Sequence, residues 1–458
     1  MALNALGRHL ALIGFMGAGK STLVEPVARR LDRPWLDIDA DASVQIREVG
    51  LERFRELEAT RTTAELFVAQ PSVYALGGGA ILHEETRAAL AERAFTVLLD
   101  VDAATAWNRV RGSDRPLAQD EGEFRRLYDE RQPLYRGVAD ATAADEDGVI
   151  LAAAGIHHEL GALDRLGELV PGAGAVALVG DATVMGIHGP RAQEALGDRL
   201  VSTHELPPGE RAKQLDVLER LWSELALDRA GTVVALGGGA ATDLAGFAAA
   251  TYLRGVPWVA VPTTLVGQVD AGIGGKTAID IPQGKNLVGA FHWPARVVLD
   301  EALLETLPER ERRQGRAELI KTELLAGREL DVRAAAAYKA AICLRDPHDE
   351  DVRRWLNLGH TFAHALEAAA DFDLPHGEAV ALGLVAALRL SGRDPAPVVD
   401  ALDPQPVRVD RDRAWEALQR DKKRTADDIN LVLLAADGPT VEARPADEVR
   451  AALDTLIS

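Results

Sequence analysis

A run of glycines followed by a lysine and two hydroxyl residues stands near the N-terminus. Residues 14–22 read GFMGAGKST and match G-x-x-x-x-G-K-[ST], between an apolar segment and a helical one. Glycines let successive backbone N–H groups converge on phosphate oxygens, and a helix start adds a favourable partial charge. Lys20 would reach the β- and γ-phosphates, and Ser21 would bind magnesium. The pattern predicts an ATP site whose contacts are Gly14, Gly17, Gly19, Lys20, Ser21 and Thr22.

Two carboxylates and two arginines follow this loop. Asp37 and Asp39 lie in DIDAD, on the same side of an extended segment. One of them could orient magnesium through water while the other holds a substrate hydroxyl, or the pair could form a solvated acidic turn. Arg115 in RPL suits a mobile lid that meets the transferring phosphate and ATP, and Arg131 in ERQPLY ends a helical pattern. Taken singly, each arginine is more readily explained as a surface charge.

Three histidines near the C-terminus form a second constellation. His360 and His364 are four residues apart, on one face of an expected helix, and His376 begins the next helix after Pro375. Neutral imidazoles and one carboxylate make a good zinc site with an open position. The alternative is a buried structural pair of histidines. Spacing does not choose the carboxylate, although Glu318 in RAELIK is attractive.

Two glycine-rich segments lie between these constellations. In residues 233–255, a strand, the turn GGG and a helix follow one another, but Thr242 stands where a dinucleotide fingerprint has its third glycine. The turn could hold a pyrophosphate, and alone it is a weak signal. In residues 261–291, Lys276 and Lys285 stand among glycines and apolar residues. Such a loop suits an anionic substrate better than a plain surface position.

The elements that must position these residues fall into three units. Strands alternate with helices over residues 9–160, and a second alternation runs from about 175 to 302. After about Leu303 the pattern is helical, with one late strand in INLVLLAADG. We therefore expect an α/β protein: a P-loop kinase domain with a parallel sheet (1–160), a linker (161–175), a Rossmann-like α/β domain (176–302) and a mostly α-helical domain (303–458).

Composition narrows the classes of function. The chain has 458 residues and a formal net charge of −20, which argues against a nucleic-acid surface. Its one cysteine, Cys343, excludes disulfides within the chain and thiolate metal sites. The apolar run LALIGF is too short to cross a membrane and lacks the cleavage site of a signal peptide. We expect a cytoplasmic enzyme that acts on small molecules, without nucleic-acid or membrane partners.

The N-terminal motifs together resemble shikimate kinase. The phosphate loop, D-x-D, LGGGA, RPL and R-x-P-L-Y occur in the family's order over residues 9–140. The resemblance implies that Asp37 supports magnesium, that Asp39 binds the hydroxyls of shikimate and that Arg131 binds its carboxylate. It also implies that Arg115 is the lid arginine and that the glycines of the turn approach the ring; these are Gly77, Gly78 and Gly79. Lys20, Asp39 and Arg115 would then be the catalytic residues.

One stretch departs from the kinase pattern. The family usually shows GE-x-x-FR-x-x-E between the second strand and the glycine turn, and the stretch aligned with it here reads LEATRTTAE. That alignment places the shikimate-binding arginine at Arg61, one position early, which turns its side chain by about 100° around the helix. The helix register could shift instead, or Arg55 could take the role.

The rest of the chain resembles 3-dehydroquinate synthase. The landmarks LPPGERAK, GGG…DLAGF, VPTTL, VDAGIGGKTA, GKNLVGAF, AELIK, LNLGHTFAHALE, HGEAVA and DKK occur in order from about residue 180 to 434. The resemblance implies NAD⁺ and a divalent metal, zinc or cobalt, held by Glu318, His360 and His376. His364 would then belong to the substrate pocket. It also implies a homodimer through the synthase part.

The same resemblance assigns two further groups of residues. Contacts to NAD⁺ would come from Asp181, Glu210, Lys213, Gly238, Gly239, Asp243, Thr263 and Thr264. Contacts to the substrate would come from Asp270, Lys276, Lys285, Asn286, Lys321, Lys339, Arg353, His364, Lys422 and Lys423. Among these, Lys276, Lys321 and His364 are the expected catalytic residues.

Together the two resemblances imply a bifunctional enzyme of the shikimate pathway. One part would phosphorylate shikimate with ATP and magnesium, and the other would convert 3-deoxy-D-arabino-heptulosonate 7-phosphate to 3-dehydroquinate plus phosphate. Two alternatives stay open. The C-terminal part could be a related sugar-phosphate cyclase, or the N-terminal part could bind nucleotide without catalysis.

Overall fold

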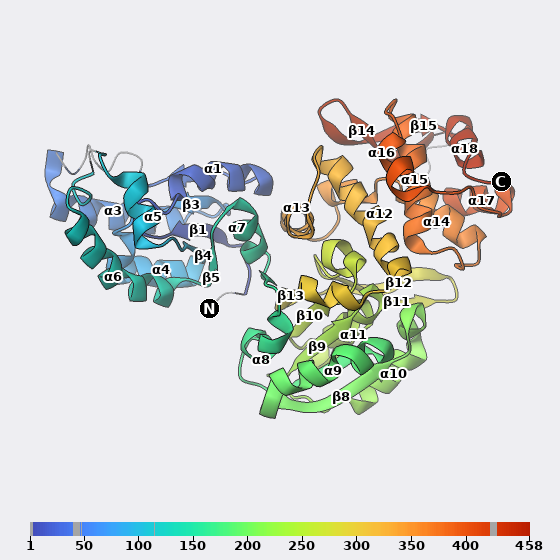
Figure 1. Cartoon of the computed structure of the whole chain (residues 1–458), viewed down its shortest axis with the longest axis horizontal. Coiled ribbons are helices and arrows are strands. Elements are labelled where there is room, and N and C mark those ends of the chain that lie inside the picture. The colour runs from blue at the N-terminus through green and yellow to red at the C-terminus, as the bar shows by residue number, and fades with distance from the viewer. Residues whose placement is uncertain (1–2, 40–45, 47, 114, 422–427) are drawn as a thin grey trace. The chain divides into compact units, whose positions relative to one another are not determined.

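The computed structural model describes residues 3–39, 46, 48–113, 115–421 and 428–458 (Figure 1). These residues form two compact units, residues 1–157 with 340–345 and residues 158–339 with 346–458. Among the described helices, none combines the length and the apolar composition that a membrane crossing requires.

The first unit is built on a five-stranded sheet with the order β2-β3-β1-β4-β5, in which each neighbouring pair is parallel. Its strands are β1 (His9–Ile13), β2 (Trp35–Asp37), β3 (Val73–Ala75), β4 (Ala94–Leu99) and β5 (Ala141–Ala143). Its helices are α1 (Lys20–Leu31), α3 (Leu51–Leu66), α4 (Glu84–Arg93), α5 (Ala103–Val110), α6 (Glu121–Val138) and α7 (Glu146–Ala153). This is the parallel α/β architecture that the alternation of the sequence predicts.

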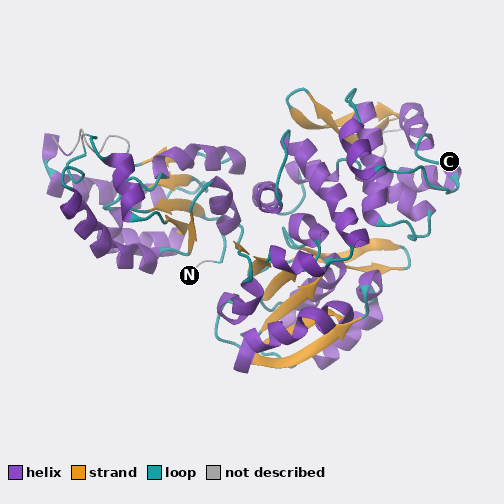
Figure 2. Cartoon of the chain, in the orientation of Figure 1, coloured by secondary structure: helices purple, strands orange, loops and turns teal. Residues whose placement is uncertain are grey.

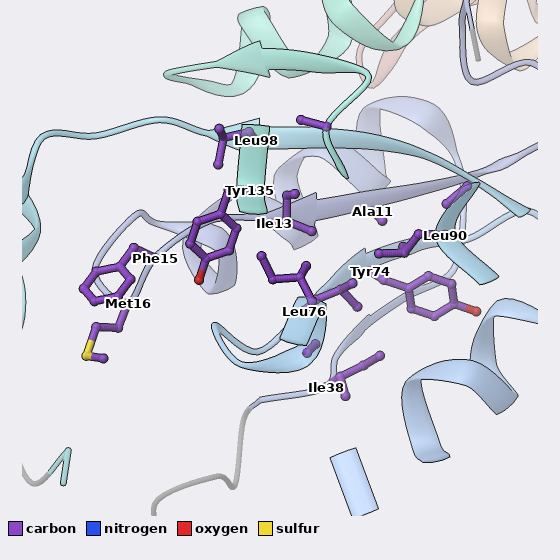
Figure 3. Close-up of a cluster of buried hydrophobic side chains, with 14 of the residues drawn as sticks. Ala11, Ile13, Phe15, Met16, Ile38, Tyr74, Leu76, Leu90, Leu98 and Tyr135 are labelled. Carbon is purple, nitrogen blue, oxygen red and sulfur yellow. The ribbon is translucent and has the colours of Figure 1, made fainter. Parts of the chain in front are cut away.

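The central strands of this sheet are buried along their whole length, which explains their continuous apolar runs. Figure 3 shows Ile13, Leu76 and Tyr135 gathered in one cluster of buried side chains, which also contains Phe15. Phe124 packs edge-on against Phe15 with ring centroids 5.0 Å apart, an arrangement that aromatic rings prefer. The cluster lies under the phosphate loop and gives it a rigid base.

The second unit contains a six-stranded sheet with the order β6-β13-β10-β9-β7-β8. Its strands are β6 (Ile156–His158), β7 (Val176–Asp181), β8 (Leu200–Leu206), β9 (Thr232–Gly237), β10 (Trp258–Pro262) and β13 (Arg296–Leu299). The helices that follow its strands are α8 (Leu166–Leu169), α9 (Ala182–Leu196), α10 (Leu215–Glu224) and α11 (Gly239–Thr251). Figure 2 shows these helices packed around the strands.

The segment 161–175, expected to be a linker, is packed into this sheet domain. Leu163 and Leu166 are fully buried in the core cluster of the second unit. The carboxylate of Asp300 accepts hydrogen bonds from the backbone N–H groups of Gly161 (2.9 Å) and Leu163 (3.1 Å). The Ala/Gly-rich composition of the segment therefore reflects close packing rather than freedom of the chain.

The remaining residues of the second unit are mostly helical and carry two hairpins. The helices are α12 (Glu309–Ala326), α13 (Val332–Arg345), of which residues 340–345 are counted with the first unit, α14 (His360–Ala369), α15 (His376–Leu390), α16 (Ala396–Leu402), α17 (Arg411–Asp421) and α18 (Ala446–Asp454). The hairpins pair β11 (Lys276–Ile281) with β12 (Gly284–Phe291) and β14 (Asp428–Ala435) with β15 (Gly438–Pro445). The sequence had predicted β14 alone, because β15 begins with Gly-Pro, ends in Pro and is half exposed.

Close backbone contacts lock the helices that carry the histidines. A Cβ at Gly383 in α15 would stand 2.1 Å from the carbonyl oxygen of Gly359, which precedes α14. A Cβ at Gly377 would stand 2.5 Å from the Cα of Gln314 in α12. Glycine is therefore required where α15 meets its two neighbours, and His376 sits beside one of these contacts.

Candidate active sites

The phosphate loop has the geometry that its glycines predict. Gly17 and Gly19 have φ angles of 84° and 103°, in the left-handed region that favours glycine. A Cβ at Gly17 would stand 2.6 Å from the carbonyl oxygen of Ala106, so α5 packs directly against the loop. Gly19 is the N-cap of α1, whose first residues are Lys20, Ser21 and Thr22. The loop and the helix start thus form the cradle expected for phosphates.

Lys20 is buried at the base of this cradle. Its Nζ donates hydrogen bonds to the carbonyl oxygens of Gly14 (2.8 Å) and Phe15 (3.2 Å). Burial lowers the pKa of Lys20 to about 8, although Asp39 and Asp37 partly oppose the shift. Burial also raises the pKa of Asp39, while Lys20 and Arg115 lower it. These predicted residues therefore lie within electrostatic reach of one another.

Glu58 joins this group from α3, and the sequence had not assigned it a role. A Cβ at Gly77 would stand 1.7 Å from Oε1 of Glu58 and 3.0 Å from Oδ1 of Asp39, so only glycine leaves room for both carboxylates. Burial, with a smaller contribution from Asp39, raises the pKa of Glu58 to about 7. The glycine turn of residues 77–79 thus leaves space beside two acids at the end of β3.

Two side chains of α6 fix the glycine turn. Nη1 of Arg131 donates to the carbonyl oxygen of Gly78 at 3.1 Å, and the hydroxyl of Tyr135 donates to the same oxygen at 2.6 Å. Arg131 is only 4% exposed, so it is a buried cation rather than the surface charge that it could have been alone. Tyr135, the last residue of ERQPLY, went unassigned in the sequence although it lies in the motif.

The structure corrects the expectation for Arg61. Arg61 is exposed, whereas Arg55 on the same helix is partly buried and faces the cluster. The guanidinium Nε of Arg55 lies 3.9 Å from where a Cβ at Gly79 would stand. Burial and, to a smaller extent, the charge of Arg131 lower the pKa of Arg55, while Glu58 raises it. The two arginines are six positions apart in the sequence, which puts their side chains about 120° apart around the helix. Arg55 therefore faces the predicted shikimate site, and Arg61 does not.

A further arginine, Arg109 in α5, was also missed from the sequence. Its Nη1 donates to the carbonyl oxygens of Gly17 (3.0 Å) and Ala18 (3.4 Å), 92 and 91 residues away in the chain. No local motif marks it, because the contact depends on how α5 packs on the loop. Arg109 therefore holds the phosphate loop in shape and adds positive charge beside it.

In the second unit, Asp181 ends β7 and caps α9. Its Oδ1 accepts from the backbone N–H groups of Thr183 (2.8 Å) and Val184 (3.3 Å), and its Oδ2 accepts from that of Gly209 (3.1 Å). The carboxylate thereby joins the end of β7 to the segment that carries Glu210 and Lys213. The structure thus brings together residues that are about 30 positions apart in the sequence.

The second glycine turn lies between β9 and α11. A Cβ at Gly238 would stand 3.0 Å from Cγ2 of Thr264, and one at Gly239 would stand 3.1 Å from the Cβ of Ala271. The hydroxyl Oγ1 of Thr263 is buried without a hydrogen-bond partner among the described atoms. A tight turn at a helix start with an unsatisfied hydroxyl beside it fits a dinucleotide pyrophosphate.

Lys213 links the predicted cofactor residues to a predicted substrate residue. Its Nζ pairs with Oδ2 of Asp243 at 2.6 Å and also donates to Oδ1 of Asn286. Asn286 has a φ of 57°, and Oδ1 of Asp280 accepts its backbone N–H at 2.9 Å. Asp280 therefore holds Asn286 in a left-handed conformation that turns its amide toward Lys213. The predicted cofactor residues and the predicted substrate residues are therefore joined in one hydrogen-bond network.

Glu318, His360 and His376 come together from three helices. One ligand atom from each lies within 4.8 Å of the other two. Nε2 of His376 is 3.0 Å and Nε2 of His360 is 3.4 Å from Oε1 of Glu318, which is fully buried. Burial lowers the pKa of His360 and favours the neutral imidazole that binds metals. The donor set fits a divalent zinc-type ion with room for another ligand.

A buried charge network adjoins this group. Nζ of Lys321 lies 2.6 Å from Oε2 of Glu318 and 3.2 Å from Oδ1 of Asp270, and Nζ of Lys339 lies 2.7 Å from the same Asp270 oxygen. Burial opposes ionisation of Asp270, but the two lysines outweigh it and hold its pKa at about 2. Asp270 lies in a short π-helical turn (Gly267–Ala271), a feature frequent at functional sites.

Two more predicted substrate cations are held by the loop before α14. Nζ of Lys276 pairs with Oδ2 of Asp349 at 2.5 Å, a partner 73 residues away that the sequence did not reveal. Arg353 donates to the carbonyl oxygens of Gly274 (2.8 Å) and Pro347 (2.9 Å). Lys276 and Arg353 are thereby both held at the beginning of β11.

Of the other predicted residues, Lys285 lies with its Nζ 4.7 Å from the ring centroid of Phe372. His364 is exposed, and its ring packs edge-on against His360 at 5.5 Å. Lys422 and Lys423 lie outside the described residues.

Three family models match consecutive parts of the chain. The shikimate kinase model matches residues 16–154. The model of the N-terminal domain of 3-dehydroquinate synthase matches residues 203–314, and that of its C-terminal domain matches residues 296–424. The kinase match contains Lys20 and Arg131 and all but the first two residues of the phosphate loop, and the C-terminal synthase match contains all three candidate metal ligands.

The curated relatives that this chain resembles include several 3-dehydroquinate synthases. The chain is 43% identical to 3-dehydroquinate synthase of Symbiobacterium thermophilum over 58% of this chain and 76% of the relative. It is 39% identical to that of Bordetella pertussis over 65% of this chain and 95% of the relative. The fold is similar to 2-deoxy-scyllo-inosose synthase (TM-score 0.58, 23% identity, covering 66% of this chain and 96% of that one). It is also similar to ValA, a 2-epi-5-epi-valiolone synthase from Streptomyces hygroscopicus subsp. jinggangensis, with NAD⁺ and Zn²⁺ bound (TM-score 0.54, 25% identity, covering 66% and 96%).

Proposed function

The chain belongs to the 3-dehydroquinate synthase family and carries a shikimate kinase domain before the synthase, and we propose that the two constellations described above perform these two reactions at separate sites. It is a bifunctional enzyme of the shikimate pathway. The observation that carries the proposal is the buried group of Glu318, His360 and His376 beside the Asp270–Lys321–Lys339 network. A metal donor set next to paired buried charges suits oxidation and elimination on an anionic sugar phosphate.

In the synthase, the metal ligands are Glu318, His360 and His376, with zinc or cobalt as the ion. The glycine turn at the start of α11, together with Asp181, Lys213 and Thr263, would hold NAD⁺. When bound, the metal would supply Lewis-acid chemistry at a substrate hydroxyl, and NAD⁺ would supply reversible hydride transfer without being consumed. ValA, which binds NAD⁺ and Zn²⁺, supports this assignment.

The chain's own residues bind and orient the seven-carbon substrate. Lys276 and Arg353 present cations to its phosphate and carboxylate, and the substrate would displace Asp349 from Lys276. Lys285, Asn286 and His364 complete the pocket by the family resemblance, together with Lys422 and Lys423. Asp270 pairs with Lys321 and Lys339 and holds both side chains in place, so that both can donate to substrate oxygens.

In the kinase, the phosphate loop holds ATP, and Lys20 and Arg115 contact the transferring phosphoryl group. Ser21 and Asp37 hold magnesium, directly or through water. Asp39, Gly77 and Gly79 face the shikimate ring, while Arg131 with Arg55 binds the carboxylate. Positioning and charge stabilisation dominate phosphoryl transfer, which explains why cations and carboxylates surround this small volume.

Two alternative functions, another sugar-phosphate cyclase and a non-catalytic N-terminal domain, have less support than the two proposed reactions. The curated 3-dehydroquinate synthases are 38–44% identical to this chain, whereas ValA is 25% identical. That contrast favours dehydroquinate over another cyclase product. An N-terminal domain that binds nucleotide without catalysis would not need the complete set formed by Lys20, Asp39, Arg115 and Arg131.

We also propose that the protein forms a homodimer through its synthase part and acts in the cytoplasm, as the two metabolic families imply. For the domain limits we propose residues 1–160, 176–302 and 303–458.

An assay of the purified full-length protein for both reactions tests the proposal. With NAD⁺ and zinc, phosphate should be released from 3-deoxy-D-arabino-heptulosonate 7-phosphate, and chelation of the metal should stop the release. With ATP and magnesium, ADP formation should depend on shikimate. Synthase turnover without shikimate-dependent ADP formation, despite intact ATP binding, would support the module without catalysis. Turnover of a different sugar phosphate in place of the heptulosonate would support the other cyclase.

Matched substitutions distinguish the two arginines of α3. Arg55→Ala should raise the KM for shikimate by about 10²-fold, because a charged hydrogen bond to a carboxylate is worth about 1.5–3 kcal/mol. Arg61→Ala, which removes an exposed cation from the same helix, should leave that KM unchanged within about twofold. The measurement is steady-state kinase kinetics with shikimate varied at saturating ATP. A larger effect from Arg61→Ala would restore the alignment that places Arg61 in the site.

A further inference from the structure

Glu367 lies next to the proposed metal site but is neither a ligand nor one of the substrate residues. It stands in the last turn of α14 and is 4% exposed. Its Oε1 is 3.2 Å from Nδ1 of His376, whose Nε2 is 3.0 Å from Oε1 of Glu318. The imidazole of His376 is therefore held between two buried carboxylates, one at each ring nitrogen.

The two ring nitrogens of His376 have different surroundings. Nε2 faces the side where Glu318 and His360 converge, so it is the nitrogen that would bind the metal. Nδ1 then carries the proton, and this N–H donates a hydrogen bond to Glu367. His360 differs, because the outer partner of its Nδ1 is the carbonyl oxygen of Leu358 at 3.2 Å. One histidine ligand thus has a neutral outer partner, and the other has a charged one.

An unusual turn brings Glu367 and His376 together. Asp371 and Phe372 have φ angles of 53° and 64°, which are uncommon for residues other than glycine. Arg413 of α17 forms an ion pair with Asp371, and the N–H of Phe372 donates to the carbonyl oxygen of Glu367 at 2.8 Å. The turn reverses the chain so that the first residue of α15 reaches the last turn of α14. Backbone strain of this kind persists where the surrounding structure fixes a functional geometry.

We propose that Glu367 is a positioning residue that fixes the tautomer and orientation of His376 and strengthens its bond to the divalent metal. The inference rests on the proposed function, because it takes Glu318, His360 and His376 as the ligands. A carboxylate that accepts the outer N–H of a ligating imidazole raises the basicity of the inner nitrogen. Because Glu367 is buried, water competes little for this hydrogen bond, so its removal should weaken metal binding itself.

Zinc affinity of the full-length, metal-free protein measures this role. We expect Glu367→Gln, which keeps an acceptor but loses the charge, to weaken zinc binding about 10-fold, and Glu367→Ala about 100-fold, by competition with a chromophoric chelator. The visible spectrum of the cobalt-loaded protein should shift in Glu367→Ala, because the orientation of His376 changes. Glu378→Gln is the matched control: it removes an exposed carboxylate two residues from His376 and should bind zinc as the unmodified protein does.

The outcomes separate this inference from the metal site itself. Zinc affinities of both Glu367 variants within about twofold of the unmodified protein would overturn the positioning role, as would an equal loss in Glu378→Gln. His376→Ala should bind zinc far more weakly than any of these. If His376→Ala retains full affinity, the proposed ligand set is wrong, whereas a loss confined to His376→Ala overturns only the role of Glu367. Should Glu367→Ala fail to fold, the isosteric Glu367→Gln decides.

Discussion

Replacement of His360 with alanine should remove the metal from the synthase and reduce its turnover by on the order of 10³-fold, because Lewis-acid stabilisation by a bound metal is worth several kcal/mol. His360 is buried and shares Oε1 of Glu318 with His376, so the variant leaves only two of three donors. Two donors do not hold zinc in a defined geometry. Metal content by elemental analysis and phosphate release from the heptulosonate phosphate measure the two effects.

The control for this prediction is the neighbouring histidine. His364→Ala removes the other imidazole of the i, i+4 pair, but His364 is exposed and is not part of the donor group. We expect this variant to keep its zinc and to raise the KM for the substrate. The kinase turnover of His360→Ala should stay unchanged, because the proposed kinase residues lie in the first unit and His360 lies in the second. Retained zinc in His360→Ala, or loss of zinc in His364→Ala, would contradict the assignment.

The contrast between these histidines shows what spacing can and cannot predict. Three histidines within 17 positions indicate a metal site, but the i, i+4 pair contributes only His360 to it. Glu318 lies 42 positions earlier, and many other acids were equally possible from spacing. It is selected by the packing of α12 against α15, where Gly377 allows backbone contact with Gln314. Spacing therefore predicts a metal site, and tertiary packing determines which side chains converge as its candidate ligands.

The fold was predictable where burial dominates. The runs HLALI, TVVALG and WVAVP are buried on both faces, and such strands are visible as continuous apolar segments. The hairpin β11–β12 was expected to be a loop, because glycines and exposed residues weaken its pattern. The hairpin is held by contacts such as Lys276–Asp349, which join residues 73 positions apart and leave no local signal in the sequence.

Arg55 shows how an alignment and the packing of a helix can point to different residues. An arginine of α3 was expected in the shikimate site, and the arginine of α3 that lies near the glycine turn is Arg55. The alignment with LEATRTTAE pointed to Arg61, six positions later, whose side chain is exposed. The phosphate loop carried no such ambiguity, because its glycines, Lys20 and Ser21 are contiguous in the sequence.

Replacement of Lys20 with methionine should reduce kinase turnover by on the order of 10³-fold, the loss typical when one preorganised donor to a transition state is removed. Methionine keeps an apolar stem in the buried position but lacks the ammonium that the carbonyl oxygens of Gly14 and Phe15 hold in place. The synthase reaction of the same protein should be unaffected. Arg29→Ala removes an exposed cation from the same helix and should leave kinase turnover unchanged.

The pH dependence of ATP binding gives this prediction a second readout. Because burial lowers the pKa of Lys20 to about 8, the free enzyme loses this charge as the pH rises through that value. ATP binds the protonated form, so its affinity should fall between about pH 7 and about pH 9.5 in the unmodified protein and stay flat in Lys20→Met. Titration of a fluorescent ATP analogue at several pH values measures this. A tenth or more of normal kinase turnover in Lys20→Met, or the same pH dependence in both proteins, would show that Lys20 does not contact the transferring phosphate.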